Sequence, residues 1–230
     1  MNFEIEKKFL VNDFNLVMDL LKKDFGDYQL RKKAGFWFAT NFDRMELFLD
    51  MDKPLFSKKD VTTIKDIAEL AVPEMDFEYC RIRIVNSESY IITFKIKNLV
   101  NNIEQNTEYE FEIDKETAQR IHNILKSKSH IFFYNIKESY EFKKENLKIE
   151  LSRLTDLTDS YLEVELTGDN EKDLTKKLEF ELEKFKLYSI VEEPRSYTRL
   201  TKIENRNKFK NLKLSNYSKE ATKSLESLLQ

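Results

Sequence analysis

Glycine and proline are scarce in this chain, with three residues of each among 230. So few glycines exclude a phosphate-binding loop or a dinucleotide-binding turn, and so few of either residue exclude long flexible linkers. The single cysteine, Cys80, cannot form an internal disulfide, which suits a reducing compartment. No apolar run reaches the length of a membrane span, and Glu4, Glu6, Lys7 and Lys8 interrupt the start where a signal peptide would need an apolar stretch. We therefore expect a cytoplasmic protein with no membrane partner.

Charge of one dominant sign is also lacking. The 39 Lys and Arg residues nearly balance the 42 Asp and Glu residues, for a net charge of -3. This balance argues against a protein that coats nucleic acid or binds membranes through a polybasic surface, because those partners require an excess of positive charge. Yet charged residues make up 35% of the chain, well above the usual quarter. The excess must lie on solvated faces or inside an unusually polar site.

The hydrophobic periodicity predicts an α+β fold in which strands alternate with a few amphipathic helices. The first helix is expected to begin at Asn12 or Asp13 and to end at Gly26. Strands are predicted at about 2–10, 28–43, 76–85, 90–97, 104–113, 129–142, 147–151 and 161–166, and further helices at about 61–70, 114–125, 171–185 and from 214 onward. We expect one domain over residues 1–202 and a helical extension over 203–230.

The polar faces of these strands are almost purely ionic. Arg81 and Arg83 lie two residues apart, as do Glu163 and Glu165, so each pair falls on one side of its strand. The same holds for Glu4 with Glu6, for Lys95 with Lys97, and for Glu108 with Glu110 and Glu112. Like charges at this spacing repel, unless opposite charges or ions lie across from them.

The other face of the same strands is apolar. A closed barrel that is apolar outside, under helices, and ionic inside satisfies both faces. Burying many charges costs several kcal/mol per ion unless each is paired, so such an interior indicates a binding site for a highly charged ligand. Arg and Lys suit phosphate oxygens, and carboxylates suit a hard cation such as Mg²⁺. A polyphosphate with its divalent metal uses both signs.

An ordered series of short motifs resembles the CYTH superfamily of triphosphate tunnel metalloenzymes. Glu4-Ile5-Glu6-Lys7-Lys8 resembles the E-x-E-x-K opening of that family. The later motifs follow in the family's order over residues 1 to 202: Arg81-Ile82-Arg83, Thr93-Phe94-Lys95 with Lys97, Glu108-Tyr109-Glu110, Leu162-Glu163-Val164-Glu165 and Arg195-Ser196-Tyr197. The resemblance implies an eight-stranded antiparallel tunnel.

The resemblance also implies roles for individual residues. Glu6 and Lys8 would be catalytic, by orienting or deprotonating a water molecule. The triphosphate would be bound by basic residues, namely Lys8, Arg81, Arg83, Lys95, Lys97, Lys137, Arg153 and Arg195. Mg²⁺ or Mn²⁺ would be held by Glu4, Glu6, Glu163 and Glu165, with Glu108, Glu110 and Glu150 in support.

The implied activity is metal-dependent hydrolysis of a triphosphate carried by a small molecule, with an RNA 5′-triphosphate end as the one nucleic-acid partner that fits. Two alternatives stay open. One is an adenylate cyclase of the CYTH type, and the other is a non-catalytic module that binds polyphosphate. The sequence departs from the family pattern at Lys137-Glu138-Ser139, where the family often has K-x-R, and at Glu150, where it usually has aspartate. These departures concern the choice of substrate more than the fold.

Overall fold

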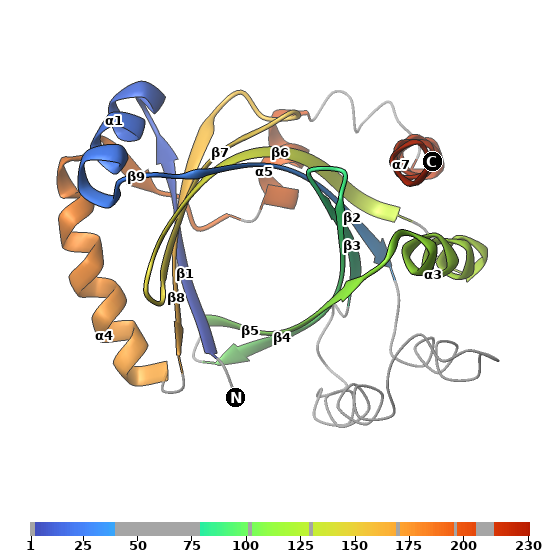
Figure 1. Ribbon diagram of the computed structural model, residues 1–230, viewed down its shortest axis with the longest axis horizontal. Helices are drawn as coiled ribbons and strands as arrows, with labels where there is room; N and C mark the ends of the chain where they lie inside the picture. Colours follow the sequence, from blue (N-terminus) through green and yellow to red (C-terminus); the bar gives the residue numbers. More distant parts are fainter. Residues whose placement is uncertain are drawn as a thin grey trace. The chain divides into compact units, whose positions relative to one another are not determined.

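The computed structural model describes residues 3–39, 79–100, 103–128, 131–168, 171–195, 197–205 and 214–230 (Figure 1). The helix expected at 61–70 lies outside these ranges, as does the end of the strand expected at 28–43. The remaining predicted strands and helices are present, with shifted ends, and the class is α+β.

Nine strands are described: β1 (Phe3–Val11), β2 (Gln29–Ala39), β3 (Tyr79–Val85), β4 (Ser89–Val100), β5 (Ile103–Ile113), β6 (Ile131–Lys144), β7 (Leu147–Leu154), β8 (Ser160–Gly168) and β9 (Ile190–Glu192). Their hydrogen-bonded order is β5-β4-β3-β2-β6-β7-β8-β1-β9. Every pair whose register is given is antiparallel. The expected closed barrel of eight strands is therefore wrong. Among the described residues the sheet has nine strands and is not closed, with β5 and β9 at its two ends.

The helices are α1 (Phe14–Phe25), α3 (Lys115–Lys128), α4 (Glu171–Leu182), the 3₁₀ helix η2 (Glu183–Leu187), α5 (Tyr197–Glu204) and α7 (Leu214–Leu229). Within the described ranges, none of them combines the length and the apolar character that crossing a membrane requires. The helix expected at 171–185 is divided into α4 and η2.

The chain divides into two compact units. The first unit comprises Met1–Ala34 and Asn135–Asn211, and the second comprises Gly35–Tyr134 and Leu212–Gln230. β2 and β6 each contribute to both units. The domain boundary expected at residue 202 stays a prediction, and α7, in the extension expected after it, belongs to the second unit.

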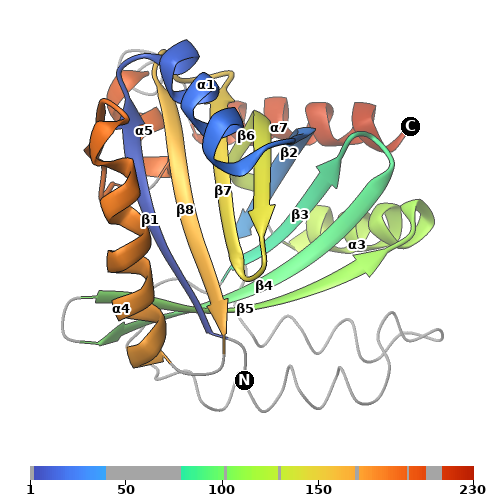
Figure 2. The same ribbon diagram turned by 60° about the vertical axis from the view of Figure 1, so that its left-hand side comes forward.

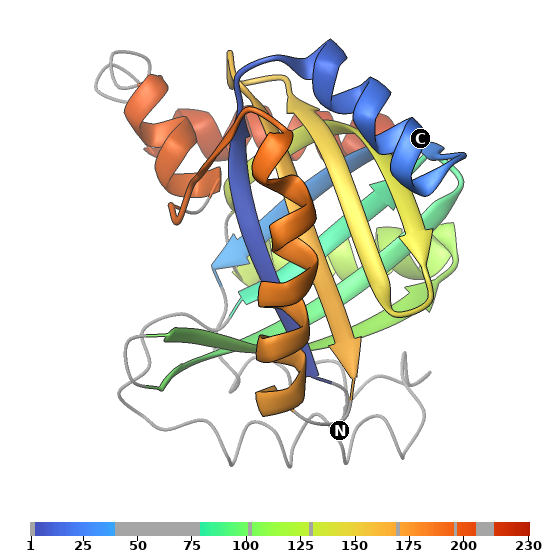
Figure 3. The ribbon, with the colours of Figure 1, turned by 90° about the vertical axis from the view of Figure 1, so that its left-hand side faces the viewer.

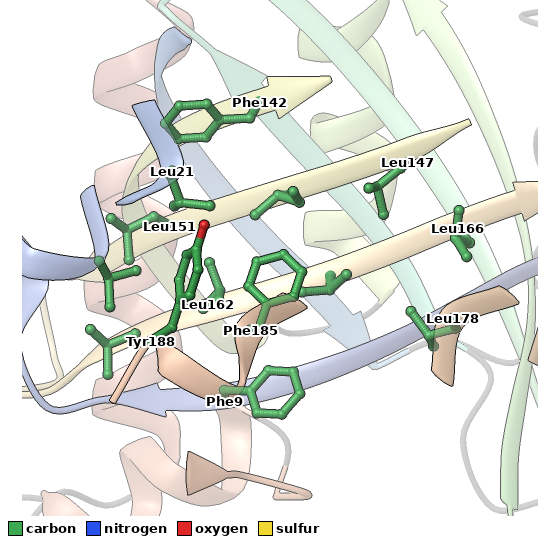
Figure 4. Close-up of a cluster of buried hydrophobic side chains, with 14 of the residues drawn as sticks. Phe9, Leu21, Phe142, Leu147, Leu151, Leu162, Leu166, Leu178, Phe185 and Tyr188 are labelled. Carbon is green, nitrogen blue, oxygen red and sulfur yellow. The ribbon is translucent and has the colours of Figure 1, made fainter. Parts of the chain in front are cut away.

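The main core of the first unit lies between the sheet and its helices. Figure 3 shows α4 running along β1 and β8, and α1 over β7. Buried side chains from α1, α4 and η2 pack on one face of β1, β6, β7 and β8 (Figure 4). Val17, Leu21, Ile149, Leu162 and Val164 are fully buried in this cluster. The apolar face expected under helices is thus confirmed, and the opposite face of the same strands is left to the charged residues.

Local signals explain the limits of α1. The side chain of Asp13 accepts a hydrogen bond from the Leu16 amide at 3.0 Å, which satisfies one of the free amides at the helix start. Gly26 ends the helix with φ of 82° and ψ of -133°, a backbone conformation that only glycine adopts readily. Asp13 and Gly26 therefore set the limits that the sequence predicted.

In the second unit, α3 and α7 are in contact, and they lie side by side in Figure 2. The Gln119 side chain donates to the carbonyl oxygen of Leu229 at 2.6 Å, and the Tyr217 hydroxyl accepts from the Tyr134 amide at 3.1 Å. The rings of Phe38 and His122 lie 6.3 Å apart, which joins β2 to α3. These contacts attach α7 to the body of the second unit.

Candidate functional site

One face of the first unit carries charged side chains of both signs. Directly opposite residues of an antiparallel pair share a face, and the strand registers give two rows. The first row joins Glu141, Glu150, Glu163 and Lys8, and the second joins Lys148, Glu165 and Glu6. We call these side chains, together with Arg31, Lys33 and Lys137, the ionic face.

Three carboxylates of the ionic face stand in one cross-strand row. Glu141, Glu150 and Glu163 occupy directly opposite positions on β6, β7 and β8. Like charges directly opposite one another destabilise a sheet. Glu141 and Glu150 are also buried, at 5% and 4% exposure. The row is therefore stable only if cations stand between its members.

Two lysines supply those cations. Lys33 contacts the carboxylates of Glu141 and Glu150, and its Nζ lies 2.6 Å from Glu150 Oε2. Lys137 contacts Glu150 and Glu163, and its Nζ lies 2.5 Å from Glu163 Oε2. The result is a continuous chain of alternating sign across four strands, β2, β6, β7 and β8. Arg31 extends it, with Nε 3.0 Å from Glu141 Oε2.

The charges at the centre of the ionic face are strongly coupled. Burial would raise the pKa of Glu150, but the ammonium groups of Lys137 and Lys33 outweigh it and hold that pKa well below its ordinary value. Burial would lower the pKa of Lys137, but the carboxylates of Glu150 and Glu163 raise it. Both groups are therefore ionised at neutral pH. Ser139 also donates a hydrogen bond to Glu150 at 3.0 Å.

The second row lies nearer to solvent. Lys148 Nζ is 2.5 Å from Glu165 Oε2, and Glu165 directly opposes Glu6 of β1. Burial would lower the pKa of Lys148, but Glu165 raises it. Glu6 is exposed. The carboxylates of Glu6 and Glu165 thus stand opposite each other on neighbouring strands, and Lys148 of β7 contacts one of them, Glu165.

Lys8 has a different environment. Its Nζ donates to the carbonyl oxygen of Arg195 and lies 4.4 Å from the ring centroid of Tyr197. Burial lowers the pKa of Lys8, although Glu163, Glu6 and Glu193 act in the opposite direction. Among the contacts described, Lys8 thus has an aromatic ring and a carbonyl oxygen where the other lysines of the ionic face have carboxylate partners.

In the second unit, a smaller charged group lies across β3, β4 and β5. Arg81, Thr93 and Glu110 occupy directly opposite positions. The Arg81 guanidinium lies 3.1 Å from Glu110 Oε1 and 3.2 Å from the Thr93 hydroxyl, and the Arg83 guanidinium lies 3.3 Å from the same Glu110 oxygen. Arg81 also lies 5.5 Å from the Trp37 ring centroid. Arg81, Arg83 and Glu110 thus share one face, while the ligand and supporting roles expected of them stay predictions.

Some predicted site residues are described only by their backbone. Glu4 pairs with Thr167, Lys95 with Glu108, and Lys97 with Asn106. The side chains of Glu4, Lys95, Lys97 and Glu108 lie outside the described part of the structure. Their roles therefore stay predictions.

The predicted role of Arg153 needs correction. Arg153 lies three residues after Glu150 on β7, so alternation directs it to the opposite face. Its guanidinium lies 3.8 Å from the ring centroid of Phe14, in α1 on the helix-covered side. The structure therefore does not bring Arg153 to the ionic face. Arg195, another predicted ligand, pairs with the buried carboxylate of Glu193, which lies next to the backbone of Lys8.

Sequence reasoning missed four members of the ionic face, namely Arg31, Lys33, Glu141 and Lys148. A signal was present for them, because each lies two residues from another charged or polar position on its strand: Arg31 from Lys33, Glu141 from Ser139, and Lys148 from Glu150. Tyr197 touches the ionic face and appeared in the sequence only within the Arg195-Ser196-Tyr197 motif, without a role of its own. Its contact with Lys8 spans almost the whole chain and has no local signal.

The carboxylates fit a hard divalent cation by their chemistry. Carboxylate oxygens are the ligands that Mg²⁺ and Mn²⁺ prefer, and Glu6 and Glu165 stand on directly opposite positions. Among the described side chains, which exclude that of Glu4, no group of three His, Cys, Asp or Glu is arranged as a complete metal centre. The carboxylates are therefore of the type that binds such a metal. In this structure Glu163 and Glu165 are each in contact with a lysine.

In a comparison with protein families, the model of the CYTH domain fits residues 69–197. This range includes the motifs of β3, β4, β5 and β8 but not Glu4, Glu6 and Lys8 of β1. No curated protein matches the chain significantly.

Solved structures share the fold at low sequence identity. The PH1012 protein from Pyrococcus horikoshii OT3 is 19% identical, with a TM-score of 0.57 over 86% of this chain and 98% of that protein. A conserved hypothetical protein from Pyrococcus furiosus is 21% identical, with a TM-score of 0.56 over 86% of this chain and 99% of that protein. The Hippeastrum protein HpAC1, reported to have a dominant triphosphatase activity, is 16% identical, with a TM-score of 0.52 over 92% and 98%. At these identities the likeness shows the fold alone.

Proposed function

The chain belongs to the CYTH domain family, whose model matches more than half of its length, and on that premise we propose that it hydrolyses a triphosphate with the help of a divalent metal ion. The substrate class is inorganic tripolyphosphate or an organic or nucleoside triphosphate. The reported activity of the Hippeastrum relative supports hydrolysis as the first choice.

The observation that carries this proposal is the buried chain of alternating charges. Lys33 and Lys137 are only 14% and 12% exposed at their side chains, and Glu150 between them is 6% exposed. Burying such ions costs several kcal/mol each, and apolar residues of similar volume are often at least as stable in their place. An ionic interior is therefore better explained by a ligand that needs it than by stability.

Each part of the ionic face has a role in this proposal. Lys8 and Lys137 bind phosphate oxygens as point charges. Glu6 and Glu165, with Glu4 and Glu163, hold the metal, which when bound offsets negative charge on the phosphate oxygens. Glu6 or Lys8 orients the attacking water molecule, since both belong to the ionic face on β1 and neither is fully buried.

Lys33 and Glu150 have a supporting role. Lys33 and Lys137 share the carboxylate of Glu150. Lys33 also contacts Glu141, and Lys137 also contacts Glu163. We propose that this arrangement fixes the position of Lys137 before the substrate binds, so that little reorganisation is needed on binding. Arg81 and Arg83 remain predicted phosphate ligands on the strength of the family resemblance.

The test is to incubate the protein with tripolyphosphate, ATP or thiamine triphosphate and Mg²⁺ or Mn²⁺, and to separate the products. Free phosphate is the expected result. Cyclic nucleotide with pyrophosphate would instead identify a cyclase, and tight binding without turnover a non-catalytic module.

Two variants test the metal ligands. Glu6→Ala and Glu165→Ala should abolish metal-dependent phosphate release and leave the thermal unfolding transition cooperative. Glu192→Ala is the matched control, because Glu192 is an exposed carboxylate in the same unit, paired only with Lys7 at 3.3 Å among the described contacts. Full wild-type activity in excess EDTA would refute the metal requirement.

A further inference from the structure

Three residues near the start of α5, Glu193, Arg195 and Tyr197, contact Lys8. The amide of Glu193 donates to the carbonyl oxygen of Lys8 at 2.8 Å. The Lys8 ammonium donates to the carbonyl oxygen of Arg195 and lies 4.4 Å from the ring centroid of Tyr197. The backbone and the charged end of Lys8 are thus both held by these three residues.

The ring of Tyr197 also receives a second ammonium group. Lys137 Nζ lies 5.0 Å from its centroid. Both lysines belong to the ionic face, on β1 and β6, and both are near Glu163. One aromatic ring is therefore shared by two like charges that repel each other.

The ring itself is held in place by packing. Tyr161 meets it edge to face, with centroids 5.3 Å apart. It also packs against the small buried cluster of Leu154, Leu157, Tyr161 and Leu200. Its hydroxyl is buried and makes no hydrogen bond of good geometry within the described residues, while Ser152 and Glu163 are its polar neighbours. The ring is thus the part of Tyr197 that the lysines contact.

An aromatic ring holds an ammonium group differently from a carboxylate. The face of the ring attracts the cation through its quadrupole but carries no net charge. A lysine held by a carboxylate is neutralised, whereas one held by a ring keeps its charge for an incoming anion. In this site Lys33, Lys137 and Lys148 have carboxylate partners, while Lys8 is held by a carbonyl oxygen and a ring.

We propose that Tyr197 is a positioning residue that fixes the ammonium group of Lys8, beside that of Lys137, for the phosphate oxygens of the substrate. This inference rests on the proposed function for its phosphate ligand. The arrangement of ring and lysines can be tested without that function.

The first experiment measures lysine acetylation at one fixed pH by mass spectrometry, in the wild type and in Tyr197→Leu and Tyr197→Phe. Loss of the ring should increase the acetylation rate of Lys8 about fivefold to tenfold, as expected for a partly desolvated cation–π contact. Phenylalanine keeps the ring face, so its rate should stay within twofold of the wild type. Lys148 is the internal reference, because its partner is Glu165.

Tyr140→Leu is the matched control. It also removes a tyrosine ring from the first unit, but that ring packs against Phe14 and Tyr28, on the helix-covered side. It should leave the Lys8 rate unchanged. Should Tyr197→Leu fail to fold, Tyr197→Met offers an unbranched side chain that fills irregular gaps. The proposal is wrong if Lys8 reacts equally fast with and without the ring, or if the phenylalanine variant behaves like the leucine variant.

The second experiment uses turnover of tripolyphosphate. Tyr197→Leu should raise KM about fivefold to tenfold and change kcat less than threefold, because both lysines contact phosphate before and during the reaction. Tyr197→Phe should restore the wild-type KM. If Tyr197 had a purely structural role, its replacement would lower the melting temperature without raising KM more than it changes kcat. Absence of turnover in the wild type would refute the proposed function, while the acetylation rates would still decide the role of Tyr197.

Discussion

Replacing Glu150 with glutamine is the sharpest test of the charge chain in the first unit. The substitution keeps the size and shape of the side chain and removes one negative charge. In the wild type this carboxylate contacts both Lys33 and Lys137 and accepts a hydrogen bond from Ser139 at 3.0 Å. The amide oxygen can keep the bond from Ser139, so the variant removes the charge and the oxygen that faces Lys33 but keeps this contact.

The expected cost follows from the partners that remain. Removing one member of a buried ion pair costs about 3–5 kcal/mol, because the other charge is left uncompensated. Lys33 keeps Glu141 and Lys137 keeps Glu163, so neither ammonium is left alone. The lower end, about 3 kcal/mol, is therefore expected. For a chain of this size that corresponds to a fall of roughly 6–12 °C in the melting temperature.

Urea denaturation followed by circular dichroism measures this cost. Glu183→Gln is the control, because Glu183 and its partner Lys186 are 62% and 68% exposed and such pairs contribute between 0 and about 1 kcal/mol. A Glu150→Gln variant as stable as this control would refute the claim that the chain of charges is tightly coupled.

The pH dependence of stability provides a second test of the same variant. The pKa of Glu150 is well below its ordinary value in the folded state, because Lys137 and Lys33 outweigh the effect of burial. The unfolded chain therefore takes up a proton at higher pH than the folded one. The stabilisation is present above the ordinary glutamate pKa, and it is lost as the pH falls from there toward the lower folded value. Glu150→Gln should lack this part of the acid dependence, and parallel acid profiles would contradict the assignment.

Three further predictions concern other parts of the structure. Arg153→Met should keep turnover within twofold, because Arg153 packs on Phe14 away from the ionic face, and a tenfold loss in a turnover assay would contradict this. Gly26→Ala should lower the free energy of unfolding by about 1–3 kcal/mol in urea denaturation, because φ is 82° there while a Cβ would meet nothing within 4 Å. Glu110→Gln should cost about 1 kcal/mol by the same assay, since Arg81 and Arg83 share that carboxylate near the surface; no change would mean that the pairs contribute nothing.

The alternation of charged and apolar residues was enough to predict most strands and which of their faces is ionic. Glu163 and Glu165 illustrate this, because Val164 between them lies in the core as expected, as do Leu162 and Leu166 on either side. The same rule would have assigned Arg153 correctly, since three residues separate it from Glu150 and an odd separation changes the face. The expectation that Arg153 binds phosphate rests on the family resemblance alone. Local parity was the better guide at this position.

Closure and strand number could not be predicted in the same way. Alternation indicates which face of a strand is buried, but it does not indicate which other strands pair with it. β9 has three residues, Ile190–Glu192, too few for any period to be visible, yet it pairs with β1 beside Lys8. The contact between Lys8 and Tyr197 likewise depends on chain segments about 190 residues apart. Such pairings are decided by tertiary packing and leave no local pattern.

The pairing within the ionic face also bears on how a triphosphate would bind. Glu150, Glu163 and Glu165 each already contact a lysine, so the buried ammonium groups are largely neutralised from within. A bare triphosphate would have to compete with these carboxylates for the same lysines, and the displaced carboxylates would then repel it. A triphosphate that enters with a divalent cation removes this conflict, because the cation provides the carboxylates with a new partner while the lysines turn to the phosphate oxygens. Under the proposed function, the balance of charge on this face would favour exchange of partners over simple attraction, and metal and triphosphate binding should be mutually dependent.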